Sequence, residues 1–339
     1  MQSLGNRQPR AVGEANLIKL RKPLSRLERQ KGRRIGEGLW INAIMPGRKF
    51  NSGFSRVLTF MLCLSPCAAG TQAAGTPIPH GTVELIAEYQ WITTGHTLPV
   101  GLRFQMEKGW HIYWINPGDS GEPPKVMWQL PAGITTGPIE WPTPRRLGTT
   151  SIVDYGYEDT VMLIVPIHAD QHLAARGSTQ LTADLRVLVC REMCIPGRAQ
   201  LSLTLPVKSQ PPAPDPSATE LFTAVRKSLP RPLPANWKLS LAEDKDFFVL
   251  AASLGHPSTQ AIFFPVAESQ IDNAAPQKLL PTAVGFRLTL RKSDQLVKPI
   301  ERLRGVLVLS ADQSYSIDVP LRKPGTPKDE TALKSTTHK

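Results

Sequence analysis

The chain has 339 residues, of which 41% are hydrophobic and 20% are charged, so most of it is expected to fold and its length favours two domains. The net charge of +12 is unevenly distributed, because residues 1–74 hold 13 of the 40 Lys and Arg residues but only 3 of the 28 Asp and Glu residues. The remainder is nearly neutral, which excludes the bulk electrostatic attraction typical of nucleic-acid-binding proteins. The 32 prolines and 25 glycines are spread along the chain and predict short strands joined by turns.

The N-terminal region has the order of a secretory signal. Within residues 45–74, basic residues precede an apolar run at 57–64, and small residues that suit cleavage follow at 67–74. The apolar run is shorter than the ~20 residues that span a bilayer, so we expect export to an oxidising compartment and no transmembrane segment in the mature chain. Met45 lies where such a signal would begin, and residues 1–44 are therefore expected to be a disordered extension or a start-site artefact.

Residues 76–208 are predicted to form the first β domain. Apolar and polar residues alternate there with the period of two that is typical of half-buried strands, as at Leu98, Val100, Leu102 and Phe104. Proline- and glycine-containing turns separate the alternating runs. The expected strands are 83–91, 98–106, 110–115, 125–130, 160–167, 180–189 and 200–207. About seven short strands at this spacing predict an all-β, immunoglobulin-like antiparallel sandwich.

A linker and a second domain are expected after this sandwich. Residues 209–235 contain a proline-rich stretch, and the capping-box pattern Ser217-Ala-Thr-Glu220 predicts a short helix from Glu220 to Ser228. Alternation resumes in residues 236–322 and predicts a second, smaller β-sandwich-like domain. Its expected strands are 236–242, 247–253, 261–265, 285–291, 304–310 and 314–320. The polar residues 323–339 are expected to be a disordered tail.

The cysteines are the chemically reactive candidates. Of the four, Cys63 and Cys67 lie in the predicted signal, where the proline before Cys67 argues against lipid attachment. Cys190 and Cys194 therefore remain as the cysteines of the mature chain. Residues four apart can form a disulfide across a tight turn, and the Pro196-Gly197 pair after them favours a turn over a helix.

Three roles remain open for this pair. A purely structural bridge closing so small a loop would contribute only about 2 kcal/mol, which favours a redox-active pair over a staple. Met193 between the cysteines adds a second soft sulfur ligand type and leaves Cu(I) binding by Cys190, Met193 and Cys194 as a weaker alternative. No phosphate-binding glycine loop, nucleophile elbow or zinc-protease motif is found, so no cofactor is expected.

Several longer motifs around these cysteines resemble one known family. They are Gly109-Trp-His-Ile-Tyr-Trp-Ile-Asn-Pro-Gly-Asp-Ser-Gly121, Trp128-Gln-Leu-Pro-Ala-Gly133, Trp141-Pro-Thr-Pro144, Tyr155-Gly-Tyr157 and Cys190-Arg-Glu-Met-Cys-Ile-Pro-Gly197. Together they resemble the periplasmic N-terminal domain of DsbD-type thiol:disulfide interchange proteins, and specifically their ScsB-like branch. Ala261-Ile-Phe-Phe264 and Ile271-Asp-Asn-Ala-Ala-Pro-Gln277 look like the second β domain of that branch.

The resemblance implies a periplasmic location and a function for each site residue. Cys190 and Cys194 match the redox pair of the family, which takes electrons from a membrane-embedded partner and passes them to thioredoxin-fold clients in the periplasm. A short cap loop shields that pair in the family, and the resemblance places Asp154, Tyr155 and Tyr157 there, with Tyr155 as the shielding aromatic. The membrane and thioredoxin domains that follow in DsbD are missing from this sequence, so a separate DsbD-type membrane electron-transfer protein is expected to be the donor.

The leading hypothesis is a periplasmic electron carrier of the protein-disulfide reductase class, serving disulfide isomerases or cytochrome c biogenesis. The alternative is a non-catalytic module that binds copper, as in copper tolerance, or docks a partner. A third hypothesis is a scaffolding sandwich with an inert bridge. The reduction potential of the pair and the trapping of mixed disulfides would distinguish these hypotheses.

Overall fold

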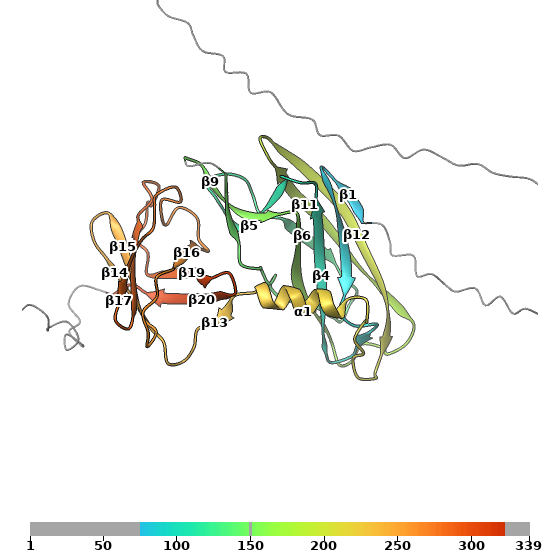
Figure 1. Ribbon diagram of the computed structural model, residues 1–339. Coiled ribbons are helices and arrows are strands. Elements are labelled where there is room, and N and C mark those ends of the chain that lie inside the picture. The colour runs from blue at the N-terminus through green and yellow to red at the C-terminus, as the bar shows by residue number, and fades with distance from the viewer. Residues whose placement is uncertain (1–74, 149–150, 323–339) are drawn as a thin grey trace, which may run out of the picture. The chain divides into compact units, whose positions relative to one another are not determined.

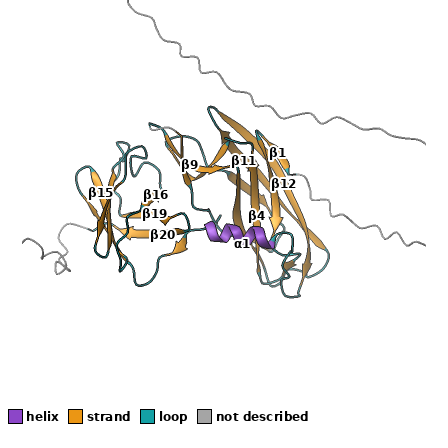
Figure 2. Ribbon diagram, viewed as in Figure 1, coloured by secondary structure: helices purple, strands orange, loops and turns teal. Residues whose placement is uncertain are grey.

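The computed structural model describes residues 75–148 and 151–322. The predicted extension, signal peptide and tail lie outside these residues. Most of the described residues lie in strands, and the described chain contains a single helix, α1 (Thr219–Ser228) (Figure 2). Over the described residues, no helix has the length and apolar character needed to cross a membrane. The all-β prediction is confirmed.

Two sheets build the first β domain (Figure 1). One has the order β1-β2-β4-β10-β7, with the bounds β1 (Thr76–Ile78), β2 (Gly81–Ala87), β4 (Thr97–Met106), β10 (Thr160–Ala169) and β7 (Ile134–Thr136). The other has the order β3-β12-β11-β5-β9-β8, with β6 paired to β11. Its strands are β3 (Ile92–Thr93), β12 (Cys194–Lys208), β11 (Ser178–Cys190), β5 (His111–Gly118), β9 (Val153–Glu158), β8 (Arg145–Gly148) and β6 (Lys125–Gln129).

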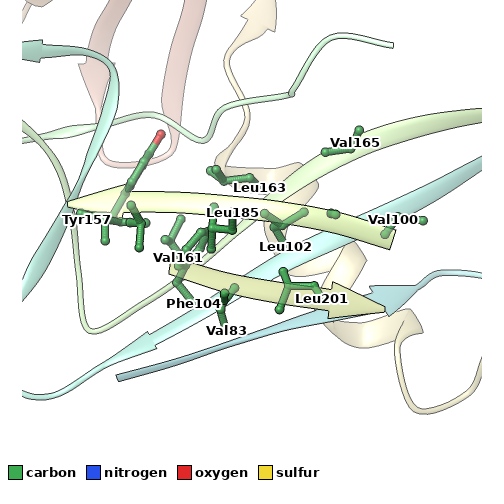
Figure 3. Close-up of a cluster of buried hydrophobic side chains, with 14 of the residues drawn as sticks. Val83, Val100, Leu102, Phe104, Tyr157, Val161, Leu163, Val165, Leu185 and Leu201 are labelled. Atoms are coloured by element: carbon green, nitrogen blue, oxygen red, sulfur yellow. The ribbon is translucent and has the colours of Figure 1, made fainter. Parts of the chain in front are cut away.

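The core of this domain is built from alternate residues of both sheets. Leu102 and Leu163 come from β4 and β10 of one sheet, whereas Leu185 and Leu201 come from β11 and β12 of the other, and all four are at most 2% exposed (Figure 3). Burying a leucine side chain contributes about 1.5–3 kcal/mol, so these facing rows hold the two sheets together. The long hairpin of β11 and β12 is thereby anchored along its inner face.

Helix α1 follows the linker but begins differently from the prediction. Its N-cap is Ala218, which makes no capping side-chain bond, while the Ser217 side chain donates to Asp215 at 2.6 Å. The capping-box prediction is therefore wrong, because Ser217 is not the N-cap residue and its hydroxyl bonds to Asp215 instead of capping the helix. Phe222 of α1 is fully buried in a small cluster that includes Met162 and Ile164 of β10, so the helix packs on the first β domain.

The second β domain has two four-stranded sheets of its own, ordered β13-β20-β19-β16 and β14-β15-β18-β17. The strands are β13 (Arg231–Pro232), β14 (Lys238–Glu243), β15 (Phe247–Ser253), β16 (Ile262–Pro265), β17 (Lys278–Thr282), β18 (Gly285–Arg291), β19 (Arg302–Ser310) and β20 (Gln313–Pro320). A separate hydrophobic cluster fills the space between them, with Phe248, Phe263 and Leu288 fully buried. Phe264, the next residue of β16, belongs instead to the hydrophobic cluster of the first β domain.

Candidate redox site

The two cysteines close the hairpin of β11 and β12. Cys190 is the last residue of β11 and Cys194 is the first residue of β12, and they face each other in the strand register. A disulfide joins them, with the two Cα atoms 4.1 Å apart. The predicted turn between the cysteines is confirmed, although β12 begins at Cys194 rather than at residue 200 and includes Pro196 and Gly197.

The residues of this disulfide differ in exposure. Cys190 is 2% exposed, whereas Cys194 lies in the exposed class at the start of β12. Cys190 is also paired in the strand register with His111 of β5, on the side of β11 away from β12. An incoming thiolate must reach sulfur along the S–S axis, so the Cys194 sulfur is the accessible end of the bond.

A tyrosine lies against the accessible end. The Tyr113 hydroxyl is 3.4 Å from Cys194 Sγ, and it must be the donor because a disulfide sulfur carries no proton. Tyr113 is two residues after His111 on β5, so the two side chains share one face of the strand, and their rings meet edge to face with centroids 5.3 Å apart. Burial raises the pKa of Tyr113, while a hydrogen bond with Ser120 lowers it to a smaller extent, so the phenol is protonated at neutral pH.

His111 is the second aromatic residue near the disulfide, next to Tyr113. Burial lowers its pKa, against the opposing charges of Asp154 and Glu158. Its Nε2 atom is buried and has no hydrogen-bond partner within the described part of the chain. The imidazole is therefore neutral at neutral pH, and the two rings next to each other near the disulfide are both uncharged.

The turn after β5 connects Tyr113 to a buried carboxylate. Ser120 donates to Asp154 from its hydroxyl at 3.0 Å and from its backbone N–H at 3.1 Å. Burial raises the pKa of Asp154, although the Ser120 hydrogen bonds oppose this. The adjacent Gly121 has φ +82°, and a Cβ atom there would lie 2.1 Å from Cζ of Tyr113, so the turn packs directly on the phenol ring.

The tip of the hairpin is held from outside by an aromatic stack. The Arg191 guanidinium lies 5.1 Å from the centroid of the Trp110 ring, and Trp110 stacks on His80 with centroids 3.7 Å apart. Such a cation–π contact is worth about 0.5–1 kcal/mol at an exposed site. It places one positive charge beside the cysteines, the sign that favours a thiolate.

The structure places the predicted cap-loop residues in a strand. Asp154, Tyr155 and Tyr157 belong to strand β9, and the two tyrosines are only 1% and 6% exposed. The Tyr155 hydroxyl donates to Asn273 Oδ1 at 2.9 Å, and that of Tyr157 donates to the Pro142 carbonyl at 2.7 Å. The expectation of a loop here is therefore wrong. The two tyrosine rings are core side chains of a strand, because the backbone of β9 pairs with Ile112 and Tyr113 of β5.

Tyr113 is the site residue that the sequence analysis missed. It lies within the Trp110-His-Ile-Tyr113 motif, whose alternation places His111 and Tyr113 on one strand face. The pairing of His111 with Cys190 depends on the register of β5 against β11, which alternation alone does not reveal.

Met193, the third residue of the weaker Cu(I) prediction, is 68% exposed at the hairpin tip. Among the described residues, no group of three or more His, Cys, Asp or Glu side chains could hold a metal ion. Both cysteine sulfurs are bonded to each other here, so copper binding would need the reduced pair.

Comparisons with known proteins bear on this domain. The family model described as "Thiol:disulfide interchange protein DsbD, N-terminal" matches residues 82–206. The chain is also similar to the N-terminal periplasmic domain of ScsB from Proteus mirabilis, with a TM-score of 0.54 and 17% identity, covering 71% of this chain and 93% of that one. This likeness shows that both β domains share a fold with that protein. No curated protein sequence matches the chain.

Two further solved structures match only weakly. A protein of unknown function from Porphyromonas gingivalis W83 has a TM-score of 0.20 and 11% identity, covering 70% of this chain and 99% of that one. The E. coli chaperone DraB has a TM-score of 0.16 and 9% identity, covering 71% of this chain and 97% of that one. Neither TM-score indicates a fold shared with this chain.

The family match and the disulfide fall on the same stretch of chain. The matched residues include both cysteines, Tyr113 and the turn that packs on it. Residues 82–206 therefore form a DsbD N-terminal domain, a module of thiol:disulfide interchange proteins.

Proposed function

We propose that this protein is a periplasmic thiol–disulfide exchange protein that relays electrons through Cys190 and Cys194. The observation that carries the proposal is the asymmetry of the disulfide, with Cys194 exposed above a hydroxyl donor and Cys190 buried. The match to the DsbD N-terminal family supports it. The donor would be a DsbD-type membrane electron-transfer protein, and the clients would be thioredoxin-fold proteins such as disulfide isomerases or cytochrome c maturation factors.

Reduction of the pair would begin at the exposed sulfur. A thiolate of the donor attacks Cys194 Sγ, a mixed disulfide forms, and Cys190 leaves as a thiolate that takes up a proton. The second thiol of the donor loses its proton and attacks the donor sulfur of the mixed disulfide, which releases Cys194 as a thiolate. Two electrons have then moved, because the donor ends as a disulfide and the protein as a dithiol.

Transfer to the client reverses these bond changes. The Cys194 thiolate attacks a client disulfide, one client sulfur leaves as a thiolate, and Cys190 then attacks Cys194 Sγ and releases the second client sulfur. The Tyr113 hydroxyl, 3.4 Å from Cys194 Sγ, is placed to donate a hydrogen bond to the thiolate whenever that sulfur is the attacking or leaving group. A hydrogen bond to the charged form lowers the pKa of a thiol, which keeps part of Cys194 reactive near neutral pH.

Trapping with single-cysteine variants tests this order of events. We expect Cys190→Ala to accumulate mixed disulfides with a thioredoxin-fold client, because Cys194 can attack but nothing resolves the product. Cys194→Ala is the matched control and should trap far less, since the remaining sulfur is buried. Equal trapping by both variants would contradict the asymmetry. A reduction potential below about −300 mV, the range of inert structural bridges, would contradict the carrier function.

A second function is favoured by one observation, the 68% exposure of Met193 between the two cysteines. A reduced pair flanking a free thioether offers soft ligands for Cu(I). Titration of the reduced protein with Cu(I) against a competing chelator checks this function, with Met193→Leu as a variant of similar size. Binding that is absent, or unchanged in Met193→Leu, would count against a copper site that uses this methionine.

A further inference from the structure

The turn that backs Tyr113 is attached to the second β domain. Residues 116–121, here named the backing turn, are the last three residues of β5 and the bend that follows them, and they touch the Tyr113 ring through Gly121. Asn116 at its start is 1% exposed and donates from Nδ2 to the Pro265 carbonyl at 2.8 Å and to the Ala267 carbonyl at 3.3 Å. Its own Oδ1 accepts from the Gly118 N–H at 3.0 Å, which fixes the bend of the turn.

A second attachment lies at the middle of the turn. Asn273 of the second β domain donates from Nδ2 to Asp119 Oδ1 at 2.8 Å, and the other carboxylate oxygen of Asp119 accepts from the Val153 N–H at 2.8 Å. Asp119 is therefore held between Asn273 and strand β9. The next residue, Ser120, bonds to Asp154 of the same strand.

Asn273 is itself fixed on its remaining sides. Its Oδ1 accepts from the Tyr155 hydroxyl at 2.9 Å, its carbonyl accepts from Arg146 at 2.6 Å, and the residue is only 8% exposed. Phe264 adds an apolar contact nearby, with its ring centroid 5.2 Å from that of Tyr155. Because buried hydrogen bonds are expensive to leave unmade, Asn273 has one favourable arrangement and acts as a rigid anchor.

We propose that the second β domain positions the redox site, with Asn273 as the positioning residue that holds the backing turn and so keeps the Tyr113 hydroxyl on Cys194. The connection runs from Asn273 through Asp119 to Ser120 and Gly121, and from there to the Tyr113 ring. This inference rests on the proposed function of the cysteine pair and assigns to the cysteine-free domain a role in the reactivity of the other domain. When the anchor is lost, the turn relaxes and the phenol loses its fixed distance to the sulfur.

The test measures the reactivity of Cys194 in the full chain. In a Cys190→Ala background, the alkylation rate of Cys194 is followed against pH, with the site identified by peptide mass. We expect Asn273→Ala to raise the apparent pKa of Cys194 and to slow its alkylation at neutral pH about 3- to 10-fold, the size of the net contribution of one typical hydrogen bond. Ser314→Ala is the matched control, because Ser314 also bonds between the two β domains, to Thr143 at 2.6 Å, but does not touch the backing turn. It should react like the parent.

A double variant with Tyr113→Phe distinguishes positioning of the Tyr113 hydroxyl from a general loosening of the fold around Cys194. Tyr113→Phe should slow alkylation as Asn273→Ala does, and the double variant should be no slower than Tyr113→Phe alone, since both act on the same hydrogen bond. Additive effects, equal shifts in Asn273→Ala and Ser314→Ala, or an unchanged rate in Asn273→Ala would each overturn the proposal.

A second variant covers the case in which Asn273→Ala does not fold. Asn273→Asp keeps the acceptor for Tyr155 but replaces the donor to Asp119 with a like charge, and it should raise the apparent pKa of Cys194 in the same direction. Failure of the proposed function is distinguishable, because a parent protein that exchanges with no thioredoxin-fold dithiol can still show the dependence of Cys194 reactivity on Asn273.

Discussion

At the scale of single residues, the two cysteines of the disulfide have different neighbours. Cys190 is paired with His111 in the strand register, while the Cys194 sulfur lies against the hydroxyl of Tyr113. Both rings are uncharged at neutral pH because burial disfavours their charged forms, lowering the pKa of His111 and raising that of Tyr113. Because both rings are neutral, the groups that favour a thiolate are the Tyr113 hydroxyl and the nearby Arg191.

The buried histidine makes folding stability depend on pH. Because the folded-state pKa of His111 lies below the usual histidine value of 6.5, the contribution of neutral His111 is present above pH 6.5 and is lost as the pH falls through the lowered pKa. We expect the free energy of unfolding of the parent to decrease relative to His111→Phe as the pH is lowered below 6.5. Urea unfolding at several pH values measures this difference, in which other titrating groups cancel. Parallel curves for the two proteins would show that His111 does not titrate differently in the folded state.

At the scale of elements, strand β9 supports β5 on the side away from the hairpin of β11 and β12. It pairs with β5 through Ile112 and Tyr113 and carries Asp154 to the backing turn. Gly156 of β9 is paired with Tyr113, and a Cβ atom at this position would lie 2.2 Å from the Ile112 carbonyl oxygen. A glycine is therefore required for β9 to lie this close to β5.

Substitution of this glycine tests the pairing. Gly156→Ala should push β9 away from β5 and lower the free energy of unfolding by about 1–3 kcal/mol, since the obstructing atom belongs to the backbone. Ser202→Ala, at an exposed position of β12, should stay within about 0.5 kcal/mol of the parent. Chemical unfolding followed by circular dichroism gives both values. A neutral effect of Gly156→Ala would mean that the strands separate without cost.

At the scale of the whole described chain, β16 of the second β domain contributes to both cores. Phe263 is fully buried in the cluster of the second domain, while Phe264 packs with the first and lies with its ring centroid 6.4 Å from that of Trp114. Successive residues of a strand point to opposite faces, so one short element links two hydrophobic clusters. The two β domains are expected to unfold together for this reason.

Two neighbouring substitutions separate these contributions. Phe263→Ala and Phe264→Ala each remove one buried ring and should cost about 3–5 kcal/mol. Phe264→Ala should in addition split unfolding into two transitions, because it removes the apolar contact between the clusters, whereas Phe263→Ala should weaken the second domain within its own core. Denaturant unfolding monitored by tryptophan fluorescence and by circular dichroism distinguishes the two outcomes. A single coincident transition in Phe264→Ala would contradict the role of this ring.

The sequence by itself determined the all-β class, most of the longer strands and the pairing of Cys190 with Cys194 at a turn. These features are local, since alternation has a period of two and the cysteines are four residues apart. Most strands of two to four residues, such as β1 and β8, were missed because they are too short to display a period, although the four-residue β16 was predicted. The edge strand β17 was not predicted for a related reason, because its residues alternate little in burial.

Only the tertiary structure decided which cysteine is exposed, which tyrosine reaches it and what holds that tyrosine in place. Tyr155 was the predicted shielding ring, yet the register of β5 against β11 brings Tyr113 to Cys194, and Tyr155 of the paired strand β9 lies in the core. Asn273 meets Asp119 across 154 positions of the chain. Contacts at such separations depend on how distant strands pair and pack, and a repeat of two residues contains no information on either.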